Sequence, residues 1–260
     1  MDLGLEGKVC VVTGASRGIG LATARKLCAE GARVLFVARS ADAVQRAADG
    51  CGGEWLAVDV TAPDAADRVI ATCAEQMGGI DVLVNNAGTS FARPLDDLSD
   101  ADWQGQWDLH VMAPMRLMRC AAPRMAAAGG GRIVNVTSSA GKRPSLTNAA
   151  YSVTKAAQLS LSRVFSDTYA GDGVLVNAVA PGPVSSDLWI AEGGLADQTA
   201  EARGVSRQEA LDAQAGKVPL GRFAEPEEIA DVVVFLCSAR ASTVTGAAWS
   251  ADGGAVNIII

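Results

Sequence analysis

The stretch that decides the fold is Thr13-Gly14-Ala15-Ser16-Arg17-Gly18-Ile19-Gly20, which joins an apolar run at 9–13 to an Ala-rich segment at 17–30. Its three glycines let the chain turn sharply, let the backbone approach an anion and let the following helix pack on a sheet. The helix N-terminus then faces the anion, because its free N–H groups and its dipole attract negative charge. The spacing G-x-x-x-G-x-G therefore predicts a pyrophosphate-binding strand–turn–helix unit, with a plain strand-to-helix turn as the alternative.

This unit opens a series of alternating strands and helices. Short, nearly continuous apolar runs predict parallel strands that are buried on both faces, at 9–13, 33–37, 55–58, 80–84, 132–136, 174–179 and 247–251. Segments long enough for crossover helices lie between them, at 17–30, 40–50, 63–77, 99–127 and 148–170, and Glu225-Pro226 opens a further helix. We predict an α/β fold with one doubly wound (Rossmann) parallel sheet of about seven strands and helices on both faces.

No linker or break in composition divides the chain, so residues 1–260 are expected to form a single domain. The segment 185–217 differs from the rest, because it is rich in Ala, Glu, Gln and Gly and contains a Gly193-Gly194 break. We expect one or two small helices there. The segment follows the sixth predicted strand and therefore lies where the carboxyl ends of the strands open, so it is a candidate lid over the substrate.

Composition excludes several classes of function. The chain has 29 Asp and Glu against 22 Lys and Arg, with no basic block, so nucleic acid is not expected as a partner. The single histidine, His110, excludes a metal site with two or three His ligands, and no metal is predicted. The six cysteines form no C-x-x-C pair and indicate reduced thiols. With no signal peptide and no apolar stretch of membrane length, they predict a cytoplasmic protein.

The glycine stretch resembles that of the short-chain dehydrogenase/reductase family, and four later motifs extend the resemblance over the chain. These are Asn85-Asn86-Ala87-Gly88, Ser138 with Tyr151-Ser152-Val153-Thr154-Lys155, Pro181-Gly182, and Gly221-Arg222 through Asp252-Gly253-Gly254. Their spacing is similar to that of the 3-oxoacyl-acyl-carrier-protein reductase-like members. The resemblance implies an oxidoreductase that interconverts a ketone, or a 3-oxoacyl group, and a secondary alcohol by hydride transfer. It also implies that helices in 99–127 and 148–170 pair between subunits of a homotetramer or dimer.

The residues after the second predicted strand indicate which nucleotide fits. An NAD site needs an acid near this point for the ribose 2′-hydroxyl, whereas an NADP site needs a cation for the 2′-phosphate. The family's acid would fall at Ala38, and Arg39 with Arg17 could clamp the phosphate from two sides. We therefore predict NADP(H) as the preferred cofactor, with NAD(H) as the alternative if both arginines are ordinary surface residues.

The resemblance assigns further residues to the cofactor. It implies that Asp59-Val60 contacts the adenine, Asn86-Ala87-Gly88 the adjoining ribose region, and Pro181 to Val184 with Ser186 the nicotinamide carboxamide. The predicted cofactor-binding set is Gly14, Ser16, Arg17, Gly18, Ile19, Gly20, Arg39, Asp59, Val60, Asn86, Ala87, Gly88, Tyr151, Lys155, Pro181, Gly182, Val184 and Ser186.

Tyr151 and Lys155 lie four residues apart at the start of a helical segment, so their side chains share one face. A lysine ammonium about 4 Å from the phenol, at an effective dielectric of about 20, contributes roughly 4 kcal/mol and lowers the pKa by roughly three units. Tyr151 is thus the predicted acid/base, and by resemblance Lys155 also holds the nicotinamide ribose. Ser138 is expected to donate to the substrate carbonyl oxygen, and its offset of 13 from Tyr151 favours it over Ser139.

His110, the fourth predicted catalytic residue, departs from the family pattern, which has Asn there to help hold a water that relays protons towards the lysine. Three interpretations compete: a substitute relay, a packed histidine with the relay rerouted, and an impaired enzyme. Two other functions also stay open for the chain. They are a dehydratase or epimerase that retains its cofactor, and a non-catalytic nucleotide sensor. The expected partner is a small carbonyl, alcohol or acyl thioester.

Overall fold

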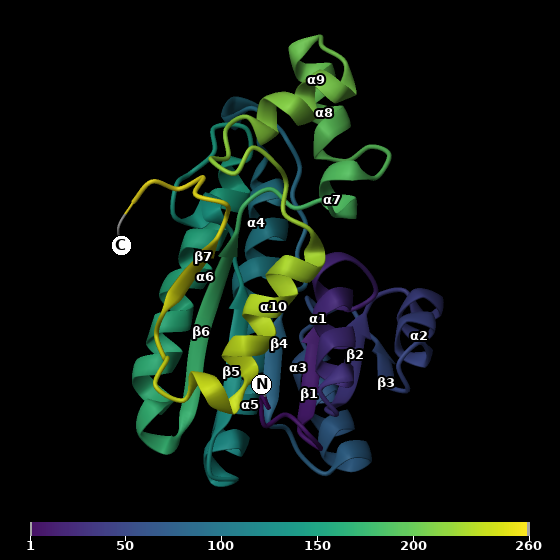
Figure 1. Ribbon diagram of the computed structural model, residues 1–260, viewed down its shortest axis with the longest axis vertical. Helices are drawn as coiled ribbons and strands as arrows, with labels where there is room; N and C mark the ends of the chain where they lie inside the picture. The colour runs from purple at the N-terminus through teal and green to yellow at the C-terminus, as the bar shows by residue number, and fades with distance from the viewer. Residues whose placement is uncertain (1, 259–260) are drawn as a thin grey trace.

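The predicted strands pair in parallel in a seven-stranded sheet of order β3-β2-β1-β4-β5-β6-β7 (Figure 1). The computed structural model describes residues 2–258. The strands are β1 (Val9–Thr13), β2 (Arg33–Ala38), β3 (Glu54–Ala57), β4 (Val82–Asn85), β5 (Gly131–Val136), β6 (Val174–Pro181) and β7 (Ala248–Ala251). The strand order reverses between β1 and β4, and doubly wound folds bind ligands outside the carboxyl ends at such a switch point. The predicted doubly wound sheet is confirmed.

Two layers of helices cover the sheet. Helices α1 (Gly18–Ala29), α2 (Ala41–Asp49) and α10 (Pro226–Cys237) pack on one face, and α3 (Ala65–Thr72), α5 (Ala113–Ala127) and α6 (Ala149–Tyr169) pack on the other. Successive side chains of β1 alternate between the two layers, because a strand has a period of two. Cys10 and Val12 join the first core, whereas Val9 and Val11 join the second. Both faces of the sheet are therefore buried.

The segment 99–127, predicted as one helix, is divided in the structure. Helix α4 (Asp100–Trp107) passes into a π-helical turn, η3 (Asp108–Met112), before α5 begins. The cause lies in Pro114, which has no N–H to donate to the carbonyl of His110 four residues earlier. Such π turns are frequent at functional sites, and this one carries His110. A second π turn, η1 (Cys73–Met77), follows α3.

The segment 185–217 forms three short helices rather than one or two. They are α7 (Asp187–Ile190), α8 (Leu195–Arg203) and α9 (Arg207–Ala215), and in Figure 1 they extend at the top, beyond the sheet. The break at Gly193-Gly194 is present, but a second break follows α8, where Gly204 takes a left-handed φ of 63°. Ser206 and Glu209 then form a capping box that starts α9, a pattern that is readable in the sequence.

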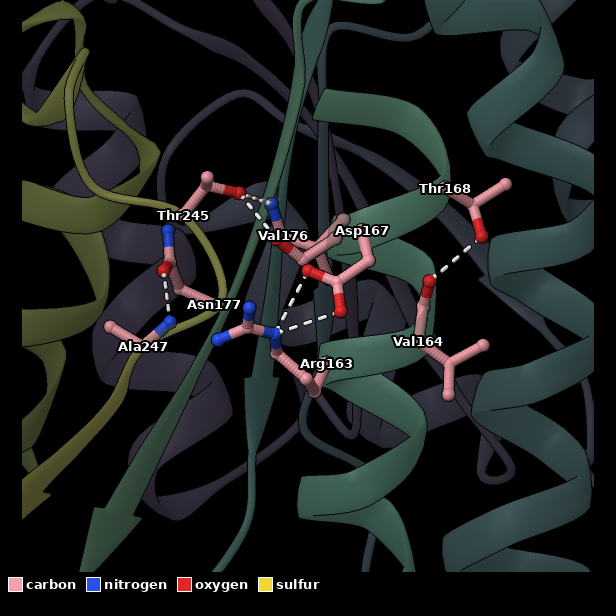
Figure 2. Close-up of polar contacts among 9 residues, drawn as sticks. Arg163, Val164, Asp167, Thr168, Val176, Asn177, Thr245 and Ala247 are labelled. Atoms are coloured by element: carbon pink, nitrogen blue, oxygen red, sulfur yellow. Dashed lines mark hydrogen bonds and ion pairs between the residues drawn. The ribbon is translucent and has the colours of Figure 1, made fainter. Parts of the chain in front are cut away.

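The last strand is attached to the sheet through side-chain hydrogen bonds at its base (Figure 2). Asn177 of β6 donates to the carbonyl of Val244 at 2.7 Å and accepts from the N–H of Ala247 at 3.1 Å. Thr245 accepts from the N–H of Val176 at 3.2 Å, and its hydroxyl lies 2.8 Å from that of Ser166 on α6. These bonds hold the segment before β7 against both β6 and α6.

Within residues 2–258, no helix is long and apolar enough to cross a membrane.

Gly20→Ala should destabilise the fold, because its Cβ would lie 2.3 Å from the Gly14 carbonyl oxygen and 2.4 Å from Asn86 Nδ2. Backbone must move to accept it, and such overpacking costs about 1 to 3 kcal/mol. Gly105→Ala is the control, because it lies inside α4 with nothing within 4 Å of the added Cβ, and it should gain about 0.5 to 1 kcal/mol. Urea unfolding followed by circular dichroism measures both. Equal stability of the two variants would contradict this account.

Candidate active site

The glycine loop between β1 and α1 is fastened to the end of β4 by a cluster of hydrogen bonds. The Asn86 side-chain amide donates to the carbonyl oxygens of Thr13 at 3.0 Å and Gly14 at 3.3 Å. In return, Thr13 Oγ1 accepts from the N–H groups of Asn86 and Ala87 at 3.0 and 3.1 Å. The side-chain amide of Asn86 therefore holds the loop in place. Thr13, which contributes this hydroxyl, is absent from the predicted site.

A cavity of about 1750 Å³ lies beside this loop, among residues from the carboxyl ends of the strands. It brings together nearly all of the predicted site residues, although they are scattered from residue 14 to residue 186. Two of them, Gly20 and His110, do not line it. Gly20 packs behind the loop against Gly14 and Asn86, and His110 lies behind Gly88, where an added Cβ would be 3.2 Å from His110 Nε2.

Two arginines line one end of the cavity. Arg17 pairs with Asp187 of α7 at 3.4 Å, in an exposed contact, while Arg39 forms no ion pair within residues 2–258. Asp59 lies nearby, and its carboxylate accepts from the N–H and hydroxyl of Thr61 at 2.9 and 2.7 Å. The Thr61 N–H bond lowers the pKa of Asp59 most, and the Thr61 hydroxyl and the Arg39 charge lower it further. This part of the cavity lining thus contains two arginines and the carboxylate of Asp59, whereas position 38 carries an alanine and no acid.

Ser138, Tyr151 and Lys155 line another part of the same cavity. Ser138 lies two residues beyond the end of β5, where its Oγ accepts from the N–H of Ala140 at 3.1 Å, and Tyr151 lies in the first turn of α6. Burial raises the pKa of Tyr151, and a hydrogen bond with the Ser138 side chain opposes that rise. Ser139, the competing serine, also lines the cavity.

Lys155 is buried, and its Nζ donates to two neutral acceptors, the carbonyl of Val136 and Oε1 of Gln158, each at 2.9 Å. Its Nζ lies 5.6 Å from the centre of the Tyr151 ring, and burial lowers its own pKa to about 7. The expectation that Lys155 alone brings down the pKa of Tyr151 is therefore wrong for these residues, because burial disfavours both charged forms. Gln158 was missed, although a glutamine one turn after Lys155 is visible in the sequence.

His110 is fully buried, and both of its ring nitrogens have partners. Nε2 accepts from the N–H of Thr89 at 3.3 Å, so the ring proton resides on Nδ1, which lies 3.1 Å from Thr154 Oγ1. Thr154 in turn donates to the carbonyl of Tyr151 at 2.9 Å, and the imidazole meets the Tyr151 ring edge-on at 5.2 Å. Burial, and then the charge of Lys155, hold the pKa of His110 well below its ordinary value.

These contacts favour one of the three interpretations of His110. The imidazole forms no hydrogen bond with Lys155, because Thr89 and Thr154 occupy its two nitrogens. It instead ties the loop after β4 to the first turns of α6, the helix that carries Tyr151. A packed, neutral histidine that positions the site fits this geometry better than a proton relay. Thr154 was not predicted, because its partner lies 44 residues away.

The buried His110 should make the protein less stable in mild acid. Its folded-state pKa lies below the unfolded value of about 6.5, so the unfolded chain binds the extra proton as the pH falls below 6.5. Stability that is fully present at about pH 7.5 should drop by about 1.4 kcal/mol at about pH 5.5 through this residue alone. Lys155, whose pKa is lowered from 10.5 to about 7 in the folded state, also lowers stability as the pH falls towards 7, so the difference between the wild type and His110→Asn isolates the contribution of His110. Urea unfolding at the two pH values should show a smaller drop in His110→Asn, and an unchanged drop would refute the assignment.

Comparisons with known proteins identify the family of this chain. A family model described as enoyl-(acyl carrier protein) reductase matches residues 14–256. A cis-4-hydroxycyclohexanecarboxylate dehydrogenase of Sinomonas cyclohexanicum is 38% identical over 95% of this chain and 96% of its own. A 3-oxoacyl-[acyl-carrier-protein] reductase of Vibrio cholerae is 34% identical over 97% and 98%.

Among solved structures, L-sorbose reductase from Gluconobacter frateurii, complexed with NADPH and L-sorbose, covers 100% of both chains with a TM-score of 0.92 and 38% identity. The family model and these relatives, which match nearly the whole chain, support the same family as the sequence motifs and the sheet topology. The chain is an oxidoreductase that belongs to the short-chain dehydrogenase/reductase family.

Proposed function

We propose that this chain is an NADP(H)-dependent reductase that interconverts a ketone, or a 3-oxoacyl group, and a secondary alcohol, with Tyr151 as acid/base. The observation that carries the proposal is that Ser138, Tyr151 and Lys155 line one cavity together with the glycine loop. The bound dinucleotide supplies hydride for reduction and accepts it in the reverse direction. The remaining chemistry, which binds the carbonyl and moves a proton, belongs to side chains of this protein.

The described residues fit a dinucleotide. Gly14 and Gly18 take left-handed φ values of 66° and 54°, which open the loop for close approach to a pyrophosphate. The cavity, at about 1750 Å³, exceeds the range of about 300 to 1,000 Å³ that is usual for a single small ligand. It therefore has room for a dinucleotide and a substrate together. Arg17 and Arg39 would hold a 2′-phosphate, and no acid at Ala38 opposes it.

The three side chains at the reacting end have separate roles. The Ser138 hydroxyl donates to the carbonyl oxygen of the substrate and stabilises the charge that develops there. Tyr151, whose pKa is raised by burial, keeps its proton at neutral pH and can deliver it to the oxygen as the alcohol forms. Lys155 places its ammonium beneath the Tyr151 ring and, from the same cavity wall, would hold the nicotinamide ribose. His110, through Thr154, keeps Tyr151 in position.

The named relatives support this class of reaction. By their names, one acts on a hydroxycyclohexanecarboxylate and another on a 3-oxoacyl group, and the sorbose reductase structure contains NADPH and a ketose. Each of these substrates has a hydroxyl or carbonyl oxygen to which the Ser138 and Tyr151 hydroxyls could donate a hydrogen bond. We propose a small molecule of this class as the substrate. A homotetramer or dimer that pairs helices of 99–127 and 148–170, and a cytoplasmic location, stay predictions.

We also propose that 185–217 acts as a lid over the substrate within a single domain of residues 1–260. Leu188, Trp189 and Leu195 from this segment line the cavity opposite the strand ends. Trp189 packs edge-on against Phe223 at 5.2 Å, which anchors α7. The contact between Arg17 and Asp187 joins the segment to the glycine loop. Apolar side chains at the mouth of the cavity would exclude water from the reacting carbon.

Tyr151→Phe should abolish ketone reduction, since it removes the proton donor and leaves the ring. Loss of a general acid typically costs about 10²- to 10⁴-fold in rate. The matched control is Tyr169→Phe, the other tyrosine of the chain, which stacks on Phe165 at the far end of α6. NADPH oxidation is followed with a panel of ketones and 3-oxoacyl thioesters. Turnover retained in Tyr151→Phe would refute Tyr151 as the proton donor. A wild type that binds the nucleotide but turns over no ketone would favour a sensor, and cofactor retained without net consumption would favour a dehydratase or epimerase.

Arg39→Gln should weaken NADPH more than NADH. A charge-assisted hydrogen bond to the 2′-phosphate contributes about 1.5 to 3 kcal/mol, so KM for NADPH should rise by about 10- to 100-fold. KM for NADH should change little, because NADH has no 2′-phosphate. Arg25→Gln serves as the control, since Arg25 is an exposed arginine of α1 outside the cavity. Equal effects on both cofactors would count against the phosphate clamp.

A further inference from the structure

A buried glutamine lies beside Lys155 and has no part in the reaction as described so far. Gln158 follows Lys155 by one turn of α6, and each residue is only 2% exposed. Its Oε1 accepts a hydrogen bond from Lys155 Nζ at 2.9 Å. Within residues 2–258, no carboxylate pairs with Lys155, so its only side-chain acceptor is this amide.

A buried ammonium without a carboxylate needs other stabilisation. Removing a charge from water is costly unless each donor finds an acceptor, and lysine has three N–H donors. Val136 and Gln158 accept two of them, which leaves one for the cavity that Lys155 lines. Both acceptors are neutral, so they stabilise the ammonium without cancelling its positive charge. A carboxylate in place of Gln158 would neutralise much of the field that reaches Tyr151.

The groups that face Lys155 make its charge state sensitive to this amide. Tyr151 faces it from the same helix and His110 from η3, and the charge of Lys155 lowers the pKa of His110. β5 contributes the uncharged Val136 carbonyl. Burial alone lowers the pKa of Lys155 to about 7, so near neutral pH the residue is divided between its charged and uncharged forms. Loss of one acceptor would then change how much of the protein carries the ammonium.

The geometry points to Gln158 as a positioning residue that holds the Lys155 ammonium below Tyr151 and leaves its third N–H donor for the cavity. In this role Gln158 keeps Lys155 protonated near neutral pH. The inference rests on the proposed function for its catalytic meaning. The hydrogen bond itself can be tested in the free protein, without cofactor or substrate.

The test is a pH titration of Lys155 by NMR. The chain has five lysines, so protein with ¹³C-labelled lysine gives few side-chain signals, and Lys155→Arg identifies the one that belongs to Lys155. Gln158→Met keeps the shape of the side chain and removes the amide acceptor. The Lys155 midpoint should fall by about one to two pH units in this variant, which corresponds to the loss of one hydrogen bond to a charged group. Gln158→Glu should raise the midpoint above that of the wild type.

Gln106→Met is the matched control, since Gln106 is also a buried glutamine but forms no hydrogen bond with Lys155. Its Lys155 midpoint should equal that of the wild type. An unchanged midpoint in Gln158→Met, or no rise in Gln158→Glu, would overturn the inference. Thermal melting identifies any variant that fails to fold. If one Gln158 variant fails, the Lys155 midpoint of the other Gln158 variant decides the test.

Turnover adds a second, separate measurement. In Gln158→Met, the alkaline limb of the pH profile for ketone reduction should move down by the same shift that the Lys155 signal shows, and in Gln158→Glu it should move up. A residue that only fills space would lower kcat without moving this limb. If the wild type reduces no ketone in the panel, the proposed function fails while the NMR titration still decides the role of Gln158.

Discussion

The site depends on the hydrogen bonds that join the ends of β1 and β4. Thr13 and Asn86, 73 residues apart in sequence, exchange side-chain bonds with each other's backbone at the point where the strand order reverses. Because of these bonds the glycine loop and the Ala87–Thr89 segment lie side by side and line one cavity. The same segment then contacts His110, and through it Thr154 and the first turns of α6. The hydrogen bonds between Thr13 and Asn86 thus connect the proposed phosphate-binding loop to the residues that position the proposed catalytic side chains.

Around these hydrogen bonds, the protein buries groups that ordinarily prefer water. Burial, and then the charge of Lys155, hold the pKa of His110 well below its ordinary value, and burial lowers the pKa of Lys155 to about 7. Tyr151 is held in the proton-bearing form by the same burial. Desolvation is therefore the main electrostatic influence on the three groups nearest the proposed chemistry. For Tyr151, the hydrogen bond with the Ser138 side chain opposes the rise in pKa that burial causes.

Much of this architecture could be predicted from local pattern. The strands were found because buried parallel strands are continuous runs of Val, Leu and Ile, and the glycine loop was found because its backbone conformations require glycine. The break in 99–127 was missed, although Pro114 signals it. The third helix of 185–217 was missed, although Gly204 and the Ser206-x-x-Glu209 pattern signal it. Both errors came from treating a long Ala-rich segment as a unit.

The rest could not be predicted, because it depends on contacts between distant residues. Spacing shows that Tyr151 and Lys155 share a helix face, but it does not show that Lys155 is buried and Tyr151 partly buried, and desolvation reversed the expected direction of the Tyr151 pKa. The partners of His110 lie 21 and 44 residues away, so its neutral, fully bonded state was one of three open interpretations. Thr13, Thr154 and Gln158 have no motif of their own. Their importance follows from which atoms the fold brings within hydrogen-bonding distance.

The central claim is that this cavity transfers hydride to a carbonyl carbon while Tyr151 supplies the proton. The most direct measurement uses NADPH labelled with deuterium at C4 and a reducible ketone, with the product examined by mass spectrometry. When the C4 hydrogen that is transferred is the labelled one, the account predicts one deuterium on the carbinol carbon for each NADPH consumed. An unlabelled product from cofactor labelled at both C4 positions, or a product formed without consumption of NADPH, would contradict it.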